Sequence, residues 1–264
     1  MAENAKGSPE RFGYSWARFS QLTPEQEQQF LMWMADLPME KDWAGTRFLD
    51  VGCGAGRNSY WAMKHGATSG VACDLDERSL AAARVNLEEF PTVDVRSVSV
   101  YELPFKNEFD IAFSIGVIHH LDDPVCAVSK MVDTVRPGGT VLVWLYGYEN
   151  LEIYANILSA LRRLLFSRMP LPLLRYLSYL PTAALWGFLR LPIKRNEYLR
   201  LLRGFPFKHL LHIVFDQMLP KISKHWRREE AIELLTQNGL SNVQHRWVNE
   251  VSWTVWGTKM GVTD

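Results

Sequence analysis

A glycine-rich turn between an apolar strand and a helix is the feature that most constrains the fold of this chain. The run Phe48–Val51 predicts a buried strand, and Gly52, Gly54 and Gly56 follow it directly. A helical pattern over Asn58–His65 comes next. Glycine lets the backbone turn sharply and lie against a ligand, because no Cβ intervenes. The segment therefore predicts a strand–turn–helix unit with a ligand-binding turn, whose GxGxG spacing differs from the GxGxxG of dinucleotide-binding turns.

Strand and helix patterns alternate along residues 45–147, which predicts a parallel sheet covered on both faces. Residues 226–264 complete this core with a helix and two strands, joined at Asn249-Glu250 as an antiparallel edge hairpin. The expected fold class is α/β, a doubly wound sheet of seven strands. The further strands expected are Gly70–Asp74, Val93–Val100, Phe109–Ile115, Thr140–Tyr146, Val243–Val248 and Val251–Thr258, and the further helices are Asp76–Phe90, Asp123–Val135 and Arg228–Asn238.

Residues 1–44 are expected to form an N-terminal cap on this core. Residues 1–10 are polar and predict a loose end without the apolar segment of a signal peptide. Arg11–Phe19 contains four aromatic residues, too many for a free tail. Thr23-Pro24-Glu25-Gln26 predicts a helix start, with Thr at the N-cap and Pro at the first helical position. This helix should run to about Leu37.

The alternation stops at residues 148–225, where leucine- and arginine-rich stretches contain six prolines. The 29 basic and 29 acidic residues of the chain are unevenly distributed, since residues 1–150 carry a net charge of −8 and residues 151–210 one of +8. We expect a helical lid over the substrate side, broken at prolines such as Pro181, with the apolar stripe of Leu158–Leu165 facing the core. Peripheral contact between residues 151–210 and an anionic membrane surface stays an alternative.

Composition excludes several classes of protein. Apolar residues make up 47% of the chain, enough for a packed core and against wholesale disorder. The three cysteines show no CxxC spacing, which argues against a disulfide framework and a zinc site. The longest charge-free apolar run lies between Arg175 and Arg190 and is shorter than the roughly 20 residues of a membrane span. We therefore expect a soluble cytoplasmic protein with no metal site.

Asp74 ends the second expected strand, where a carboxylate can accept hydrogen bonds from both hydroxyls of a ribose. Five sequence blocks follow one another in order: Phe48–Gly56, Val71–Leu75, Leu103–Phe105 with Phe109–Ser114, Ile115–Leu121 and Val135–Thr140. Together they resemble those of the class I S-adenosylmethionine-dependent methyltransferases that act on small molecules. The resemblance covers roughly residues 45–147, with a tail at residues 228–259. It implies a Rossmann-like fold, S-adenosylmethionine as cofactor and S-adenosylhomocysteine as product.

The resemblance implies a role for individual residues. The backbone of Gly52, Cys53 and Gly54 would face the methionine part of the cofactor, while Asp74 would hold the ribose and Leu75 would pack on the adenine. In a subset of such enzymes an aromatic N-terminal segment folds over the cofactor, where a ring attracts the sulfonium cation. The remaining cofactor-binding residues expected are Tyr14, Trp16, Asp50, Ser99, Val100 and Ile115. At Ser99 the family often has Asp, so adenine recognition should rest more on backbone groups.

His119 and His120 follow the fourth expected strand, at the edge where ligands bind in open α/β sheets. In a short helix neighbouring side chains diverge by about 100°, so only one of the two should face the substrate. His119 stands closer to the strand end and is the expected general base. Rival bases are His209, His212 and His225, and an amine acceptor needs none.

The implied reaction is in-line transfer of a methyl group to O, N or C of a small or lipid-like molecule. Two alternatives stay open. The basic helical stretch could track nucleic-acid phosphates, although it is leucine-rich and Ser114–Val117 lacks the motif of enzymes that methylate base amines. The fold could also serve as a non-catalytic binding module, against which the intact glycine turn and Asp74 argue.

Overall fold

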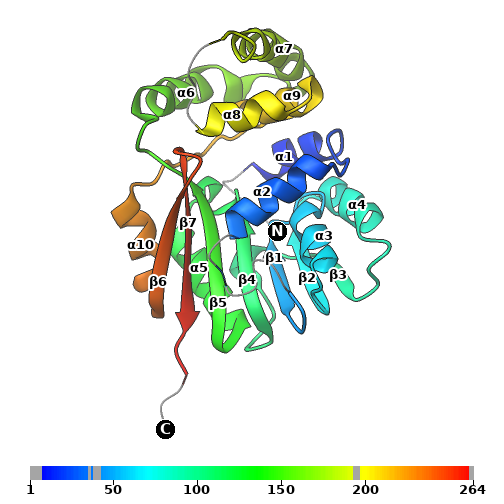
Figure 1. The fold of residues 1–264 in the computed structure, drawn as a ribbon, viewed down its shortest axis with the longest axis vertical. Helices are drawn as coiled ribbons and strands as arrows, with labels where there is room; N and C mark the ends of the chain where they lie inside the picture. The colour runs from blue at the N-terminus through cyan, green and yellow to red at the C-terminus, as the bar shows by residue number, and fades with distance from the viewer. Residues whose placement is uncertain (1–7, 35–36, 38–42, 193–196, 262–264) are drawn as a thin grey trace.

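The computed structural model describes residues 8–34, 37, 43–192 and 197–261. In these ranges seven strands form one sheet in the order β3-β2-β1-β4-β5-β7-β6 (Figure 1). Strands β1 to β5 are parallel, whereas β7 is antiparallel to both β5 and β6. The doubly wound α/β sheet with an antiparallel edge hairpin is therefore confirmed. The strands are β1 (Arg47–Val51), β2 (Ser69–Asp74), β3 (Val93–Ser97), β4 (Phe109–Ile115), β5 (Val135–Tyr146), β6 (Leu240–Val248) and β7 (Ser252–Lys259).

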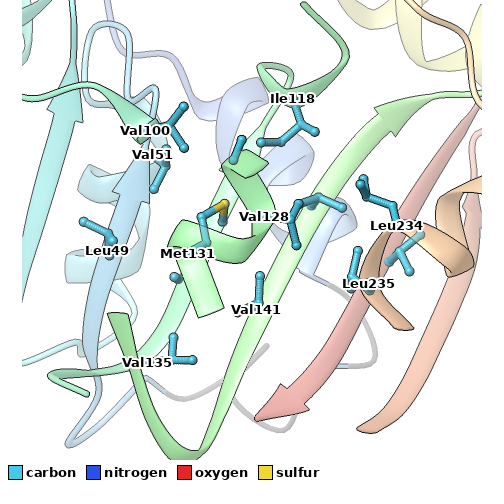
Figure 2. Close-up of a cluster of buried hydrophobic side chains, with 14 of the residues drawn as sticks. Leu49, Val51, Val100, Ile118, Val128, Met131, Val135, Val141, Leu234 and Leu235 are labelled. Atoms are coloured by element: carbon cyan, nitrogen blue, oxygen red, sulfur yellow. The ribbon is translucent and has the colours of Figure 1, made fainter. Parts of the chain in front are cut away.

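Successive side chains of a strand point to opposite faces of the sheet. Both faces carry buried apolar side chains, and helices cover both. Leu49 and Val51 of β1 pack in one buried cluster, which Figure 2 shows together with Met131 and Leu235 from the covering helices. Phe48 packs in the cluster on the other face. The helices are α5 (Pro124–Thr134) and α10 (Arg228–Thr236) on the first face, and α2 (Pro24–Met34), α3 (Arg57–Lys64) and α4 (Glu77–Asn86) on the second.

Some elements end elsewhere than the sequence predicts. β3 stops before Val100 because the hydroxyl of Ser99 accepts the N–H of Tyr101 (3.2 Å) and caps a 3₁₀ turn, η1 (Val100–Glu102). β5 begins at Val135, earlier than the predicted Thr140. The predicted hairpin turn is confirmed, since Asn249-Glu250 has the positive φ angles (53° and 61°) that a tight hairpin requires.

The N-terminal segment contains a helix, α1 (Pro9–Trp16), so the prediction of a loose chain is wrong for residues 8–10. Arg11 anchors this helix, because its guanidinium donates to the carbonyls of Leu219 (2.7 Å) and Phe166 (2.9 Å). Helix α2 begins at Pro24, as predicted. Its predicted end near Leu37 adjoins residues 35–36 and 38–42, which lie outside the described residues.

The helical block, defined as residues 148–192 and 197–225, lies beyond the carboxyl edge of the sheet (Figure 1). Pro181 does not break a helix but lies exposed within α7, where the Thr182 hydroxyl donates to the carbonyl of Ser178 (2.6 Å) in the interrupted turn. In the described part of the chain, no helix has the length and apolar character of a membrane span. The block contains α6 (Glu152–Leu164), η3 (Phe166–Arg168), α7 (Leu171–Phe188), α8 (Glu197–Gly204) and α9 (Phe207–Met218).

The predicted packing of α6 is also wrong. Leu158 is buried as expected, but Leu161, Leu164 and Leu165 are exposed, and Arg162 is only 2% exposed. The arginine turns inward because its guanidinium donates to the carbonyl oxygen of Gln217 on α9 (2.7 Å) and to the Oε1 of the same residue (3.0 Å). Helix α6 therefore buries Arg162 beside Ala155 and Leu158 and presents several large apolar side chains to solvent.

Candidate active site

The glycine turn joins β1 to α3 and is fastened to the end of β2. Gly52, Gly54 and Gly56 all have positive φ angles (77°, 55° and 76°), a conformation that glycine adopts most readily. The N–H groups of Gly52 and Cys53 donate to the carbonyl of Cys73 (2.8 and 2.9 Å). The turn therefore keeps a fixed shape with little side-chain bulk at the carboxyl edge of the sheet.

Asp74 closes this turn from the end of β2. Its Oδ2 accepts the N–H of Gly54 (3.0 Å), and its Oδ1 accepts the N–H groups of Leu75 (2.7 Å) and Asp76 (3.1 Å). Burial raises the pKa of this carboxyl, while the three N–H donors act in the opposite direction. The carboxylate is therefore held in one orientation at the place where a ribose is expected.

An apolar rim adjoins Asp74. Leu75 is 46% exposed, although it is a large apolar side chain. The N–H of Val98 donates to the carbonyl of Asp74 (3.2 Å), which brings Ser99 and Val100 to the same edge. The Ser99 hydroxyl is engaged in capping η1. A carboxylate flanked by apolar side chains fits a ribose with a flat base attached.

Asp50 lies buried behind the glycine turn. The hydroxyl of Ser59 donates to its Oδ2 (2.7 Å), and its Oδ1 has no hydrogen-bond partner among the described residues. Burial raises the pKa of Asp50 to about 7; the hydrogen bonds from Ser59 oppose this shift, and the charge of Asp74 adds to it. A buried carboxyl with an unpaired oxygen suits a cationic ligand, and S-adenosylmethionine carries an ammonium and a sulfonium.

Helix α1 packs directly on the glycine turn. A Cβ added to Gly54 would lie 2.7 Å from the indole of Trp16, and one added to Gly13 would collide with the carboxylate of Asp76. The guanidinium of Arg57 lies over the Trp16 ring, 4.4 Å from its centroid. The structure therefore places Trp16 directly against the glycine turn.

Tyr14 and Val117 contact different parts of the structure. Tyr14 packs on Phe215 of α9, with ring centroids 6.1 Å apart. Val117 was not singled out by sequence reasoning, yet a Cβ added to Gly52 would lie 2.5 Å from its Cγ2. Val117 lies two residues after Ile115, the last residue of β4. The segment after β4 is therefore in direct contact with the glycine turn.

A second group of polar side chains lies under the helical block, centred on His119. The 3₁₀ turn η2 (Ile118–His120) buries both histidines after β4. The centroid of the His119 ring lies 3.9 Å from that of the Tyr146 ring of β5 and 4.2 Å from that of the His120 ring. His120 Nδ1 donates to the carbonyl of Ile222 (2.9 Å), whereas both nitrogens of His119 lack a hydrogen-bond partner among the described residues.

Helices α6 and α9 complete this acceptor cluster, which we define as His119, Tyr146, Arg162, Gln217 and His225. Gln217 Nε2 donates to the hydroxyl of Tyr146 (2.9 Å), and His225 lies on that ring with centroids 5.7 Å apart. Nη1 of Arg162 has no partner among the described residues. Buried polar atoms are nearly always paired, so the free nitrogens of His119 and Arg162 are groups that a polar ligand can satisfy.

Burial keeps the imidazoles of this region neutral. It lowers the pKa of His119 well below its ordinary value of 6.5, and the pKa of His120 and His225 to about 3 and about 4. The charge of Arg162 acts in the same direction on all three rings. His119 is therefore an unprotonated proton acceptor at neutral pH.

Asp216 ties the helical block to the cofactor side. Its Oδ1 accepts the hydroxyl of Ser15 (2.6 Å), and its Oδ2 lies 3.0 Å from His212 Nε2. Burial would raise the pKa of Asp216, but His212, Ser15 and Arg57 together hold it below its ordinary value. Gln217 is the next residue of the same helix. Helix α9 therefore contacts both halves of the site, because Asp216 bonds to Ser15 of α1 and Gln217 bonds to Tyr146 of β5.

Three further features lie outside this chemistry. Burial raises the pKa of Cys53, so the thiol stays protonated and only its backbone is available to a ligand. Across the described ranges, no three His, Cys, Asp or Glu side chains are grouped to hold a metal ion. An open hollow of about 370 Å³, lined by Arg47, Ser69 and Arg96 among others, lies at the amino ends of the strands, opposite the glycine turn.

Comparisons with known proteins bear on the same segment. Residues 49–143 match the family described as "Methyltransferase domain". The ubiquinone biosynthesis O-methyltransferase of Aromatoleum aromaticum is 36% identical over 115 residues, which cover 39% of this chain and 48% of that protein. A tRNA U34 carboxymethyltransferase of Pseudoalteromonas atlantica is 32% identical over 97 residues, covering 36% of this chain and 30% of that protein. The chain spans half or less of these curated relatives.

A solved structure supports the fold. The O-methyltransferase family protein from Burkholderia thailandensis superposes with a TM-score of 0.58, at 12% identity, over 97% of this chain and 60% of that one. The family match contains the glycine turn, Asp74 and His119, whereas α1 and the helical block lie outside it. In its matched segment, its glycine turn and its sheet order, the chain is therefore similar to a methyltransferase domain, and it shares the fold of the solved structure.

Proposed function

We propose that this protein methylates a hydroxyl oxygen of a small molecule held between η2, β5 and α9. The observation that carries the proposal is the buried ring of His119, whose two nitrogens are unpaired. It lies two residues after Val117, which contacts the glycine turn. The O-methyltransferase name of the Aromatoleum aromaticum relative supports oxygen as the acceptor atom.

Different residues would bind the three parts of the cofactor. The backbone of Gly52 and Gly54 would take the methionine part beside Asp50, Asp74 the ribose hydroxyls and Leu75 the base. When bound, S-adenosylmethionine supplies an electrophilic methyl group and departs as S-adenosylhomocysteine. The protein holds donor and acceptor in line, an alignment that contributes about 7–11 kcal/mol to lowering the barrier.

The acceptor cluster favours an aromatic hydroxyl. The Tyr146 ring adds aromatic surface beside His119, and the unpaired Nη1 of Arg162 offers a charge-assisted hydrogen bond to an oxygen that becomes negative as its proton leaves. His119, neutral because of its burial, would take that proton. A phenol or a similarly acidic hydroxyl suits a base whose pKa is low.

The three free cysteines support a reducing compartment such as the cytoplasm. Nucleic acid is a second acceptor class, which the tRNA U34 carboxymethyltransferase relative supports. Two observations favour the small molecule. His119 and Arg162 of the acceptor cluster are buried, and the outer side of α6 carries an apolar stripe, whereas phosphate tracking needs a polar cationic surface.

The test replaces His119 with asparagine, and methyl transfer from labelled S-adenosylmethionine to hydroxylated aromatic compounds is followed between pH 5 and 9. We expect His119→Asn to lower the rate by about 10²-fold or more, with cofactor affinity retained. His245→Asn, on the exposed edge strand β6, is the matched control and should leave the rate unchanged. A rate for His119→Asn within a few-fold of wild type contradicts the proposed base.

A further inference from the structure

Helix α6 has an inverted distribution of side chains. Its exposed side carries Ile153, Ile157, Leu161 and Leu164, spaced so that they form one stripe along the helix, and Ile153 and Leu164 are 78% and 69% exposed. Its buried side carries the charged Arg162 with Ala155 and Leu158. A helix that only covered a core would place these residues the other way round.

Helix α7 repeats this inversion. Leu174, Ser178 and Thr182 are on its buried side, and the helix packs against α9. A stripe of large apolar residues faces solvent, with Leu180 reaching 78% exposure. The stripe consists of Leu173, Tyr176, Leu177 and Leu180. Two consecutive helices therefore each expose a stripe of large apolar side chains, and exposed apolar patches of this kind mark docking sites in soluble proteins.

The charge around these stripes is of one sign. Residues 153–192 contain five arginines and no aspartate or glutamate. Arg163 within α6 and Arg168 beyond it are exposed, and so is Arg190 beyond α7. Long arginine side chains can keep the guanidinium at a charged surface while their stems lie along apolar groups. Apolar stripes bordered by basic residues are the pattern of helices that lie in a membrane interface.

We propose that the outer faces of α6 and α7 dock on the surface of an anionic lipid bilayer. In Figure 1 these helices lie at the end of the molecule beyond the carboxyl edge of the sheet, so a bilayer there need not cover the β-sheet core. A second copy of the chain fits this surface less well, because a symmetric contact would bring two basic faces together. The inner side of α6 carries Arg162, so docking places the membrane next to the acceptor cluster.

Vesicle flotation of the full chain tests this proposal. The protein should float with vesicles of phosphatidylcholine and 30% phosphatidylglycerol and stay in solution with phosphatidylcholine alone. The double variant Ile157→Gln/Leu180→Gln should lose at least tenfold in partitioning. Arg163→Gln/Arg168→Gln should lose about 25-fold, since each basic residue near an anionic surface contributes about fivefold.

Matched controls come from the exposed side of α4. Val85 is 66% exposed, so Val85→Gln removes a comparable apolar side chain elsewhere, and Arg84→Gln removes a comparable charge. Neither control should change flotation. The proposal is overturned if wild-type protein does not float with anionic vesicles, or if the stripe variants float as well as Val85→Gln. It is also overturned if wild type is a stable dimer that Ile157→Gln/Leu180→Gln converts to monomer, because the surface then binds a second copy.

Discussion

Replacing Asp50 with asparagine should stabilise the protein and weaken cofactor binding at the same time. Asp50 is 1% exposed, and its pKa is raised from 3.8 to about 7. A carboxyl whose folded pKa is raised binds its proton more tightly in the folded state, so its contribution to stability is lost as pH rises from about 4 to 7. Asparagine has nearly the same shape and carries no charge at any of these pH values.

The magnitude follows from the difference between the two pKa values. At 1.36 kcal/mol per pKa unit, the raised pKa of Asp50 costs the folded state about 4 kcal/mol at pH 8 and about 1.5 kcal/mol at pH 5. Asp50→Asn should therefore exceed wild type in the free energy of unfolding by amounts that grow over this range. Urea denaturation at pH 5, 6, 7 and 8, followed by fluorescence, measures this difference.

The same variant should bind S-adenosylmethionine at least tenfold more weakly, because the cationic ligand loses a buried opposite charge. Asp133→Asn removes an exposed carboxyl of α5 and is the control, with a stability change of about 0.5 kcal/mol or less at every pH. The reasoning fails if Asp50→Asn and wild type have parallel stability curves from pH 5 to 8, or if the variant retains full affinity for the cofactor.

Three further outcomes are expected. Gly54→Ala should weaken S-adenosylmethionine binding, because its Cβ would meet Trp16. The control Gly138→Ala has a positive φ in open space and should cost only about 1 kcal/mol of stability, and equal cofactor affinity in both variants would refute this. The pKa of His225 is lowered to about 4, so the folded protein loses stability as pH falls from 6.5 to 4. His225→Gln should reduce this loss by up to about 3 kcal/mol in urea titrations, and an unchanged loss of stability over this pH range would refute it. Hydrogen exchange should be faster in residues 148–225 than in residues 48–146 without cofactor and acceptor and slow down with both, and equal protection in both states would argue against a lid.

The parts of the site that the sequence predicts are those formed by neighbours in the chain. Gly52, Gly54 and Asp74 lie at strand ends, where the βα turn alone decides the backbone path. Their positions follow from strand–turn–helix patterns, and so does the parallel order of the sheet. Even the hairpin at Asn249-Glu250 could be located, because its conformation is a local property of the turn.

The parts that escape prediction depend on contacts between distant segments. Ser15 meets Asp216 across 201 positions, and Arg162 meets Gln217 across 55. Arg162 looks like a solvated charge in sequence, and its burial inverts the assignment of the α6 stripe. The sequence of α6 does not decide which side of the helix is buried, because an apolar stripe with an arginine on the opposite side is consistent with either. Only the packing of α9 decides between them.

Methyl transfer itself tests the central claim most directly. Wild-type protein and Asp74→Ala are incubated with S-adenosylmethionine labelled on its methyl group and a pool of small hydroxylated metabolites, and labelled products are separated by mass. We predict label in a small molecule with wild type, and loss of labelling in Asp74→Ala at limiting cofactor, because loss of the ribose hydrogen bonds costs about 1.5–3 kcal/mol of cofactor affinity. Unaltered cofactor affinity in a folded Asp74→Ala protein, measured by calorimetry, or failure of folded wild type to bind S-adenosylmethionine, would contradict the assignment.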